Sequence, residues 1–364
     1  MGTNENTAGL TTPTHKYSVY RASAYWYIAC KSSELRDKPM QVRIWDTPIA
    51  LFRDTQGVPH ALLDRCAHRN VPLSSGECAG DNLMCAYHGW QFNGQGLCEK
   101  IPALHGHSIT KKRYVPAFPT REEQGFIWVF TDSNNKPNHA PYEFPHFNDP
   151  AYINIHYQAD FDATIHATAE NILDVPHTAF LHRGLFRGGE PNLLETLIRR
   201  FADRVECEYI GEPAPSGVMG KILAPGAKEV VHFDRFILPS IAQVEYQVGD
   251  ARHLLTTSAL TPIADFKTRM YSVVSVKVSK WISMVKPLVA PFAYKVIDQD
   301  KYMLQKQTQW IQEFAGEQYM STDVDCLGPS IVRLLKKASS EQVEVKTSSV
   351  GESPENETKS KILA

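Results

Sequence analysis

Two short segments in the first third of the chain each combine one cysteine with one histidine. The first contains Cys66 and His68, and the second contains Cys85 and His88. Thiolates and imidazoles bind transition metals, and a [2Fe–2S] cluster with two Cys on one iron and two His on the other needs this set of ligands. Replacing two anionic thiolates by neutral imidazoles raises the reduction potential, so the pattern predicts an electron-relaying cluster.

A structural zinc ion with two Cys and two His ligands is the alternative for this set. Zinc sites more often take a pair of cysteines from one turn and a pair of histidines from another. Here each segment supplies a mixed pair. The spacing therefore favours the cluster over zinc.

A second set of metal-ligand types lies in the middle of the chain, where His177 and His182 stand five residues apart. On an unbroken helix two such side chains would point about 140° apart. Pro176 removes a backbone donor and distorts the helix just before His177, so the two imidazoles can approach one metal. Two His and one carboxylate form the facial triad that suits Fe(II) and leaves coordination positions open.

The third ligand of this triad has four candidates, Asp234, Asp265, Asp298 and Asp300. Apolar residues recur with helical spacing over 291–314, and Asp300 falls within that stripe whereas Asp298 falls outside it. The other members of the stripe are Val296, Met303, Leu304, Gln307, Trp310, Ile311 and Phe314. A carboxylate on a buried stripe must be paired or metal-bound, which favours Asp300.

Asp174 lies one helical turn before His177 and faces the same way. A carboxylate that accepts the free N–H of a ligand histidine fixes its tautomer and its orientation. We expect this role for Asp174.

The elements that must position these side chains differ between the two halves of the chain. Short β-rich runs broken by turns over 17–135 predict a small antiparallel all-β domain. Strand-like runs flanked by helices over 136–336 predict an α+β domain with a twisted antiparallel sheet. Residues 1–16 are predicted to be a flexible N-terminus, and 337–364 a disordered tail.

Bulk composition narrows the class of partner. The chain of 364 residues has 38 Lys+Arg against 40 Asp+Glu, which gives no electrostatic footprint for nucleic acid and favours a small-molecule substrate. The apolar stretch 281–296 contains Lys286, Pro287 and Pro291, so a membrane-spanning segment is not expected. Seven cysteines without an export signal predict reduced thiols in the cytoplasm rather than a disulfide framework.

These residues resemble the Rieske proteins, and specifically the Rieske non-haem iron oxygenases. In the second Cys/His segment, Trp90 and Phe92 follow His88 as in the oxygenase form of the motif. Rieske proteins of respiratory complexes carry an extra cysteine in each loop, where this chain has Val71 and Tyr87. The pattern of the catalytic domain, Asn-x2-Asp-x2-His-x4-His followed by a late Asp, maps onto Asn171, Asp174, His177, His182 and Asp300.

The resemblance covers roughly residues 17–335 and implies a fold, two cofactors and an assembly. The fold would be an all-β Rieske domain followed by an α+β catalytic domain of the helix-grip (START-like) type. One [2Fe–2S] cluster would be held by Cys66, His68, Cys85 and His88, and one Fe(II) by His177, His182 and Asp300. Asn171 and Asp174 would be the catalytic residues, with Asp174 meeting His88 of an adjacent subunit in a head-to-tail homotrimer.

The function that this resemblance implies is that of a terminal oxygenase. Electrons would come from an external ferredoxin or flavin reductase, because the chain carries no Gly-x-Gly-x-x-Gly nucleotide fingerprint. Dioxygen would hydroxylate or demethylate a small, largely apolar aromatic or alicyclic substrate, as a monooxygenase or a dioxygenase. Two alternatives remain, a Rieske electron-transfer or redox-sensing protein with a ligand-binding second domain and a zinc-stabilised binding module. Metal analysis would distinguish the three hypotheses. The oxygenase should hold three irons per chain, the electron-transfer or redox-sensing protein two, and the zinc-stabilised module should be colourless.

Overall fold

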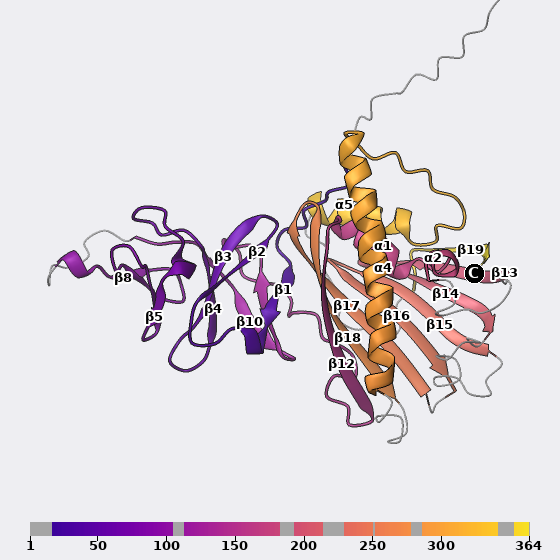
Figure 1. The fold of residues 1–364 in the computed structure, drawn as a ribbon, viewed down its shortest axis with the longest axis horizontal. Coiled ribbons are helices and arrows are strands. Elements are labelled where there is room, and N and C mark those ends of the chain that lie inside the picture. Colours follow the sequence, from indigo (N-terminus) through magenta and orange to yellow (C-terminus); the bar gives the residue numbers. More distant parts are fainter. Residues whose placement is uncertain are drawn as a thin grey trace, which may run out of the picture.

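The computed structural model describes residues 17–104, 113–182, 193–213, 229–249, 252–277, 286–340 and 353–363. Figure 1 shows two lobes, one made of small sheets and one built on a single large sheet that helices cover on one face. Within the described residues, no helix is long and apolar enough to cross a membrane.

The described strands of the N-terminal lobe form three small antiparallel sheets. One has the order β1 (Trp26–Lys31), β11 (Phe126–Phe130), β10 (Thr120–Glu123). The second has the order β2 (Met40–Ile44), β3 (Thr47–Arg53), β4 (Pro59–Leu63), β9 (Ala117–Phe118). The third has the order β5 (Glu77–Ala79), β6 (Asn82–Met84), β7 (Gln91–Phe92), β8 (Cys98–Lys100). Three 3-10 turns, η1 (Ser32–Glu34), η2 (Leu73–Ser75) and η3 (Pro102–Leu104), join them.

A compact apolar cluster lies beneath the loops that carry the Cys/His segments. Phe52, Leu62, Leu83 and Phe92 are completely buried there, and both loop cysteines belong to the same cluster. Because close-packed side chains leave little room for movement, this core fixes the loops that follow β4 and β6.

The C-terminal lobe is built on an eight-stranded antiparallel sheet with the order β12-β18-β17-β16-β15-β14-β13-β19. Its strands are β12 (Tyr152–Phe161), β13 (Leu193–Arg200), β14 (Arg204–Pro213), β15 (Glu229–Ile237), β16 (Ile241–Val248), β17 (Arg252–Ala264), β18 (Lys267–Lys277) and β19 (Asn356–Leu363). The α+β class predicted for this half is confirmed.

In the described part of this lobe, four helices accompany the large sheet: α1 (Ile165–Leu173), α2 (His177–Leu181), α4 (Lys286–Glu313) and α5 (Gly328–Ser340). Helix α1 begins where the Thr164 hydroxyl accepts a hydrogen bond from Ala167 N at 3.1 Å, an N-cap that satisfies a free backbone donor. It packs on β15 to β18 and on α5. The long α4 runs across the sheet in front of α1 (Figure 1).

The opposite face of the large sheet packs against the N-terminal lobe. An aromatic cluster joins Trp26 and Trp128 to Tyr271, and Phe144 from the connecting segment belongs to the same cluster and packs on Trp128. The Tyr271 hydroxyl donates to Ala29 O at 3.0 Å, so the contact is specific as well as apolar.

The last part of the chain differs from the disordered tail predicted for 337–364. Helix α5 continues to Ser340, and β19 pairs with β13 along its whole length, from Asn356 opposite Arg200 to Leu363 opposite Leu193. The physical reason is that β13 would otherwise end the sheet with a free edge of unpaired backbone groups, and β19 covers that edge through backbone pairing. Ile362 is buried by this pairing. Residues 1–16, predicted to be flexible, lie outside the described part of the chain.

The closing helix also departs from the prediction for 291–314. It already begins at Lys286, and its apolar stripe is only partly buried. Leu304 is buried, but Trp310 and Phe314 are 62% and 73% exposed. Helix α4 therefore contacts the lobe over a limited length, and periodicity alone overestimated its contact.

Candidate metal centres

Each Cys/His loop of the N-terminal lobe closes on itself through backbone hydrogen bonds. Cys66 N donates to Val71 O at 2.9 Å, and Cys85 N donates to Trp90 O at 2.8 Å. Gly89 adopts a positive φ of 68°, a conformation that costs glycine little. The two tight loops therefore present their four ligand-type side chains from a rigid base.

The thiols and the imidazoles form two separate pairs. The thiols of Cys66 and Cys85 are neighbours, and burial, reinforced by the Cys85 thiol, raises the pKa of Cys66 to about 11. The rings of His68 and His88 lie 4.4 Å apart, and His68 stacks on Trp90 at 4.6 Å. The buried Nδ1 of His68 has no hydrogen-bond partner in the described structure, as a nitrogen kept for a metal would have none.

This separation fits a diiron cluster better than one zinc ion. Within the described residues, the only group of three or more ligand-type side chains with all ligand atoms within 4.8 Å of one another is His177, His182 and Asp300. The cysteines and histidines of the two loops therefore do not converge on a single ion. Two sulfur ligands in one place and two nitrogen ligands in another match the two irons of a mixed-ligand [2Fe–2S] cluster.

The second centre lies where α1 ends and α2 begins. The residue after α1, Asp174, has extended backbone angles (φ −91°, ψ 108°), and α2 restarts immediately after Pro176. His177 is the first residue of α2 and His182 directly follows its last residue. The proline-broken helix thus gathers two imidazoles that an intact helix would hold apart.

Helix α4 adds the carboxylate from more than a hundred residues away. The Nε2 atoms of His177 and His182 lie 3.2 Å apart. Asp300 Oδ1 lies 3.1 Å from His182 Nε2 and 3.6 Å from His177 Nε2. Two neutral nitrogens and one carboxylate oxygen at these separations can converge on one divalent cation.

Each of these three side chains is held by a further residue. Asp174 Oδ2 lies 3.3 Å from His177 Nδ1 and accepts the backbone N–H of His177 at 3.2 Å. The backbone carbonyl of Asp174 also makes a short contact with His177 Nδ1. Asn171 Nδ2 donates to Asp300 Oδ1 at 3.3 Å. Gln299 Oε1 lies 3.0 Å from His182 Nδ1.

The pKa shifts of His177 and Asp300 are those expected of a site that binds a cation. Burial lowers the pKa of His177, but the carboxylates of Asp174 and Asp300 outweigh it and raise the pKa to about 9. Burial raises the pKa of Asp300, and the two histidines outweigh it and lower the pKa. Without a metal, a proton on His177 therefore supplies part of the positive charge that a bound cation would bring.

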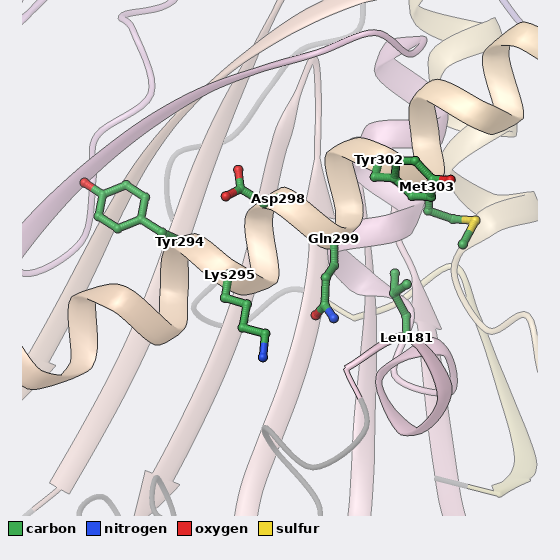
Figure 2. A pocket seen from close by; sticks show the side chains of 7 residues that line it. All are labelled: Leu181, Tyr294, Lys295, Asp298, Gln299, Tyr302 and Met303. Atoms are coloured by element: carbon green, nitrogen blue, oxygen red, sulfur yellow. The ribbon is translucent and has the colours of Figure 1, made fainter.

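The other acidic candidates lie elsewhere. Asp234 accepts from buried His232 at 3.1 Å, and Asp265 pairs with Arg21. Asp298 is exposed and points away from Gln299 in Figure 2. Sequence reasoning missed Gln299, for which the only available signal was its position next to Asp300.

The two centres are far apart within one chain. In Figure 1 the loops near β5 and β8 lie at one end of the molecule, and α2 lies at the other. His88 is exposed, and the Asp174 side chain is 33% exposed. Both centres can therefore be approached from outside the chain.

Two protein-family models match the chain in succession. The Rieske [2Fe-2S] domain matches residues 25–119, and the vanillate O-demethylase oxygenase C-terminal domain matches residues 161–341. The first contains both Cys/His loops, and the second contains the broken helix and α4.

Individual proteins of known function are similar to parts of this chain. The oxygenase component of dicamba O-demethylase from Stenotrophomonas maltophilia is 36% identical over 162 residues, which are 43% of this chain and 47% of that protein. The 4beta-methylsterol monooxygenase of Methylococcus capsulatus is 31% identical over 226 residues, 58% of each chain. The chain thus spans about half the length of these curated relatives.

A solved structure extends the likeness to the whole fold. Dicamba monooxygenase bound to dicamba superposes with a TM-score of 0.74 at 22% identity, covering 88% of this chain and 98% of that one. The Rieske domain, the oxygenase C-terminal domain and their order are those of proteins that carry a [2Fe–2S] cluster and a mononuclear iron, and the residues at both centres fit these groups. The chain belongs to the Rieske non-haem iron oxygenases.

Proposed function

We propose that this chain is the terminal oxygenase component of a Rieske oxygenase system. The observation that carries the proposal is the convergence of His177, His182 and Asp300 within 4.8 Å, on a chain that also has a Rieske domain. The overall reaction is R–H + O2 + 2 electrons + 2 protons → R–OH + H2O. When the carbon attacked is a methyl group on oxygen or nitrogen, the hydroxylated product loses formaldehyde.

In this proposal the side chains of the two centres have distinct tasks. The cluster is held by Cys66, His68, Cys85 and His88, and the mononuclear iron by His177, His182 and Asp300. The bound iron supplies oxygen activation. Asp174 holds His177, and Asn171 holds the carboxylate of Asp300, so both ligands keep their lone pairs on the metal.

Electron supply suggests an assembly of several copies. Because the two centres lie at opposite ends of one chain, a second copy must bring its cluster to this iron. A head-to-tail homotrimer would do so, with exposed His88 of one copy beside partly exposed Asp174 of the next. An external ferredoxin or flavin reductase would reduce the cluster. All seven cysteines are unpaired, which supports a reducing compartment such as the cytoplasm.

The substrate class follows from the relatives taken together. Their names include demethylases of dicamba and methylxanthine and a monooxygenase of toluene-4-sulfonate. We propose a small, largely apolar substrate, with an O- or N-methylated aromatic ring as the first class to test.

A substrate screen tests this proposal. Oxygen uptake and formaldehyde release are measured with the full chain, a surrogate reductase and NADH, over aryl methyl ethers, N-methylated heterocycles, unmethylated aromatics and methylsterols. Substrate-dependent uptake with a matching oxidised product is the expected result. A protein that accepts and releases electrons but oxidises none of these compounds would instead be an electron-transfer or redox-sensing protein.

A further inference from the structure

Gln299 occupies a place in the metal centre that neither the motifs nor the family match assigns. Its Oε1 lies 3.0 Å from Nδ1 of His182, the edge of the imidazole that does not face Asp300. His182 is only 2% exposed, so a polar atom of its ring has little access to water as an alternative partner. A buried donor left without an acceptor is costly, so the contact with Gln299 matters for the placement of this ring.

Two consecutive residues of α4 contact the two nitrogens of the His182 ring. Asp300 Oδ1 lies 3.1 Å from His182 Nε2, and the preceding residue, Gln299, reaches Nδ1. Consecutive helix residues point about 100° apart, so their side chains can pass on either side of a flat ring between them. One turn of α4 therefore controls both the metal-facing edge and the rear edge of His182.

The Gln299 amide oxygen determines which nitrogen of the His182 ring carries the proton. A carbonyl oxygen only accepts hydrogen bonds, so Oε1 facing Nδ1 requires Nδ1 to be protonated. A neutral imidazole then keeps its lone pair on Nε2, where a metal must bind. His177 differs, because its Nδ1 faces the carboxylate and the carbonyl of Asp174. The two histidines of the triad are thus held by groups of different charge.

The surroundings of Gln299 leave room to change it. It lies on the wall of a pocket of about 690 Å³, with Leu181 from α2 and Lys295, Tyr302 and Met303 from α4 (Figure 2). The lining of this pocket includes Gln299 but none of the three triad side chains, so a different side chain at 299 can be accommodated there.

We propose that Gln299 is a positioning residue of the mononuclear iron site, whose amide oxygen holds His182 in the tautomer and ring orientation that direct Nε2 to the metal. The inference deepens the proposed function and rests on it. It predicts that the acceptor at position 299, rather than its size or its neutrality, sets the affinity of the site.

Metal affinity tests this without turnover. The mononuclear site of the full chain is emptied with a chelator while the cluster absorbance is retained, and Co(II) binding is titrated by its visible bands and by competition with a chelating dye. Gln299→Leu, which keeps the bulk and loses the acceptor, should raise the Kd by about 10- to 100-fold. Gln299→Glu keeps an acceptor and should bind at least as tightly as the wild type. Glu313→Gln, a change at the exposed C-terminal end of α4 outside this pocket, should leave the Kd unchanged.

The outcomes separate this inference from the proposed function. If wild-type protein binds no Co(II) at this site, the proposed oxygenase function fails with it. If wild type binds and Gln299→Leu binds as tightly, or if Gln299→Glu is weakened as much as Gln299→Leu, the positioning role is overturned. Retained circular dichroism and cluster absorbance show for each variant that the fold has survived.

Discussion

The two candidate metal centres of this chain are built in opposite ways. The cluster site is local, with four ligand-type residues from two loops that each close through their own backbone hydrogen bonds on a β scaffold. The iron site is assembled from a broken helix and from α4, whose carboxylate is more than a hundred residues distant in sequence. Local loops can keep their shape when other parts of the chain change, whereas the iron site depends on helix packing.

Electrostatics differ between the two regions as well. At the cluster loops burial dominates and raises the pKa of Cys66, so a metal is needed to keep its sulfur as a thiolate. At the iron site, carboxylates outweigh burial and raise the pKa of His177. At the cluster loops a bound metal would have to stabilise the thiolate form of Cys66. At the iron site a bound cation would have to displace the proton on His177.

The largest expected effect separates the two centres. His177→Ala should abolish binding of the mononuclear iron and substrate oxidation, because it leaves one imidazole and one carboxylate. The cluster should be untouched, so its visible absorbance stays at the wild-type level. Cys85→Ser is the reciprocal change and should remove the cluster absorbance. Substrate oxidation by His177→Ala would show that the broken helix is not the reaction site.

A smaller effect is expected at Asp174. Asp174→Asn removes the charge beside His177 Nδ1 but keeps an oxygen there, so metal affinity or turnover should fall by about 10- to 100-fold. If Asp174 also faces a partner's cluster, reoxidation of the reduced cluster by O2 should slow in stopped-flow absorbance. Asp162→Asn, an exposed carboxylate near α4, is the control and should change neither quantity.

The pH dependence of Co(II) binding at the iron site should reflect the raised pKa of His177. Since the pKa of His177 is raised to about 9, a proton must leave before a cation can bind. The affinity for Co(II) should therefore rise roughly tenfold per pH unit up to about pH 9 and level off above it. Titrations at several pH values check this, and in Asp174→Asn, which removes one of the two carboxylates that raise the pKa of His177, the affinity should level off at a lower pH. An affinity that does not change with pH would contradict the raised pKa.

The smallest effect is expected at Asn171. Its amide makes one hydrogen bond of 3.3 Å to Asp300, so Asn171→Ala should cost about 0.5–1.5 kcal/mol, or about 2- to 13-fold in Co(II) affinity. A larger loss of Co(II) affinity than in Asp174→Asn would contradict this ranking. It would mean that Asp300 depends more on Asn171 than His177 depends on Asp174.

The cluster loops and the broken helix could be predicted from sequence because their spacing is itself the chemical signal. Asp300 could be separated from Asp298 by helical periodicity, and the structure does bring Asp300 to the two histidines. Gln299 could not be found in this way, because an amide on a helix has no pattern until its partner is placed. The exposure of Trp310 and the pairing of β19 also depend on tertiary contacts that periodicity does not contain.

Iron counting on the purified full chain is the sharpest test of whether a diiron cluster and a separate mononuclear iron share this chain. Iron per chain is measured together with the electron paramagnetic resonance of the reduced protein, for wild type and for His177→Ala. We expect three irons per wild-type chain and two in the variant, with the same signal of a reduced mixed-ligand cluster in both. Two irons in the wild type, with no loss in His177→Ala, would contradict this expectation.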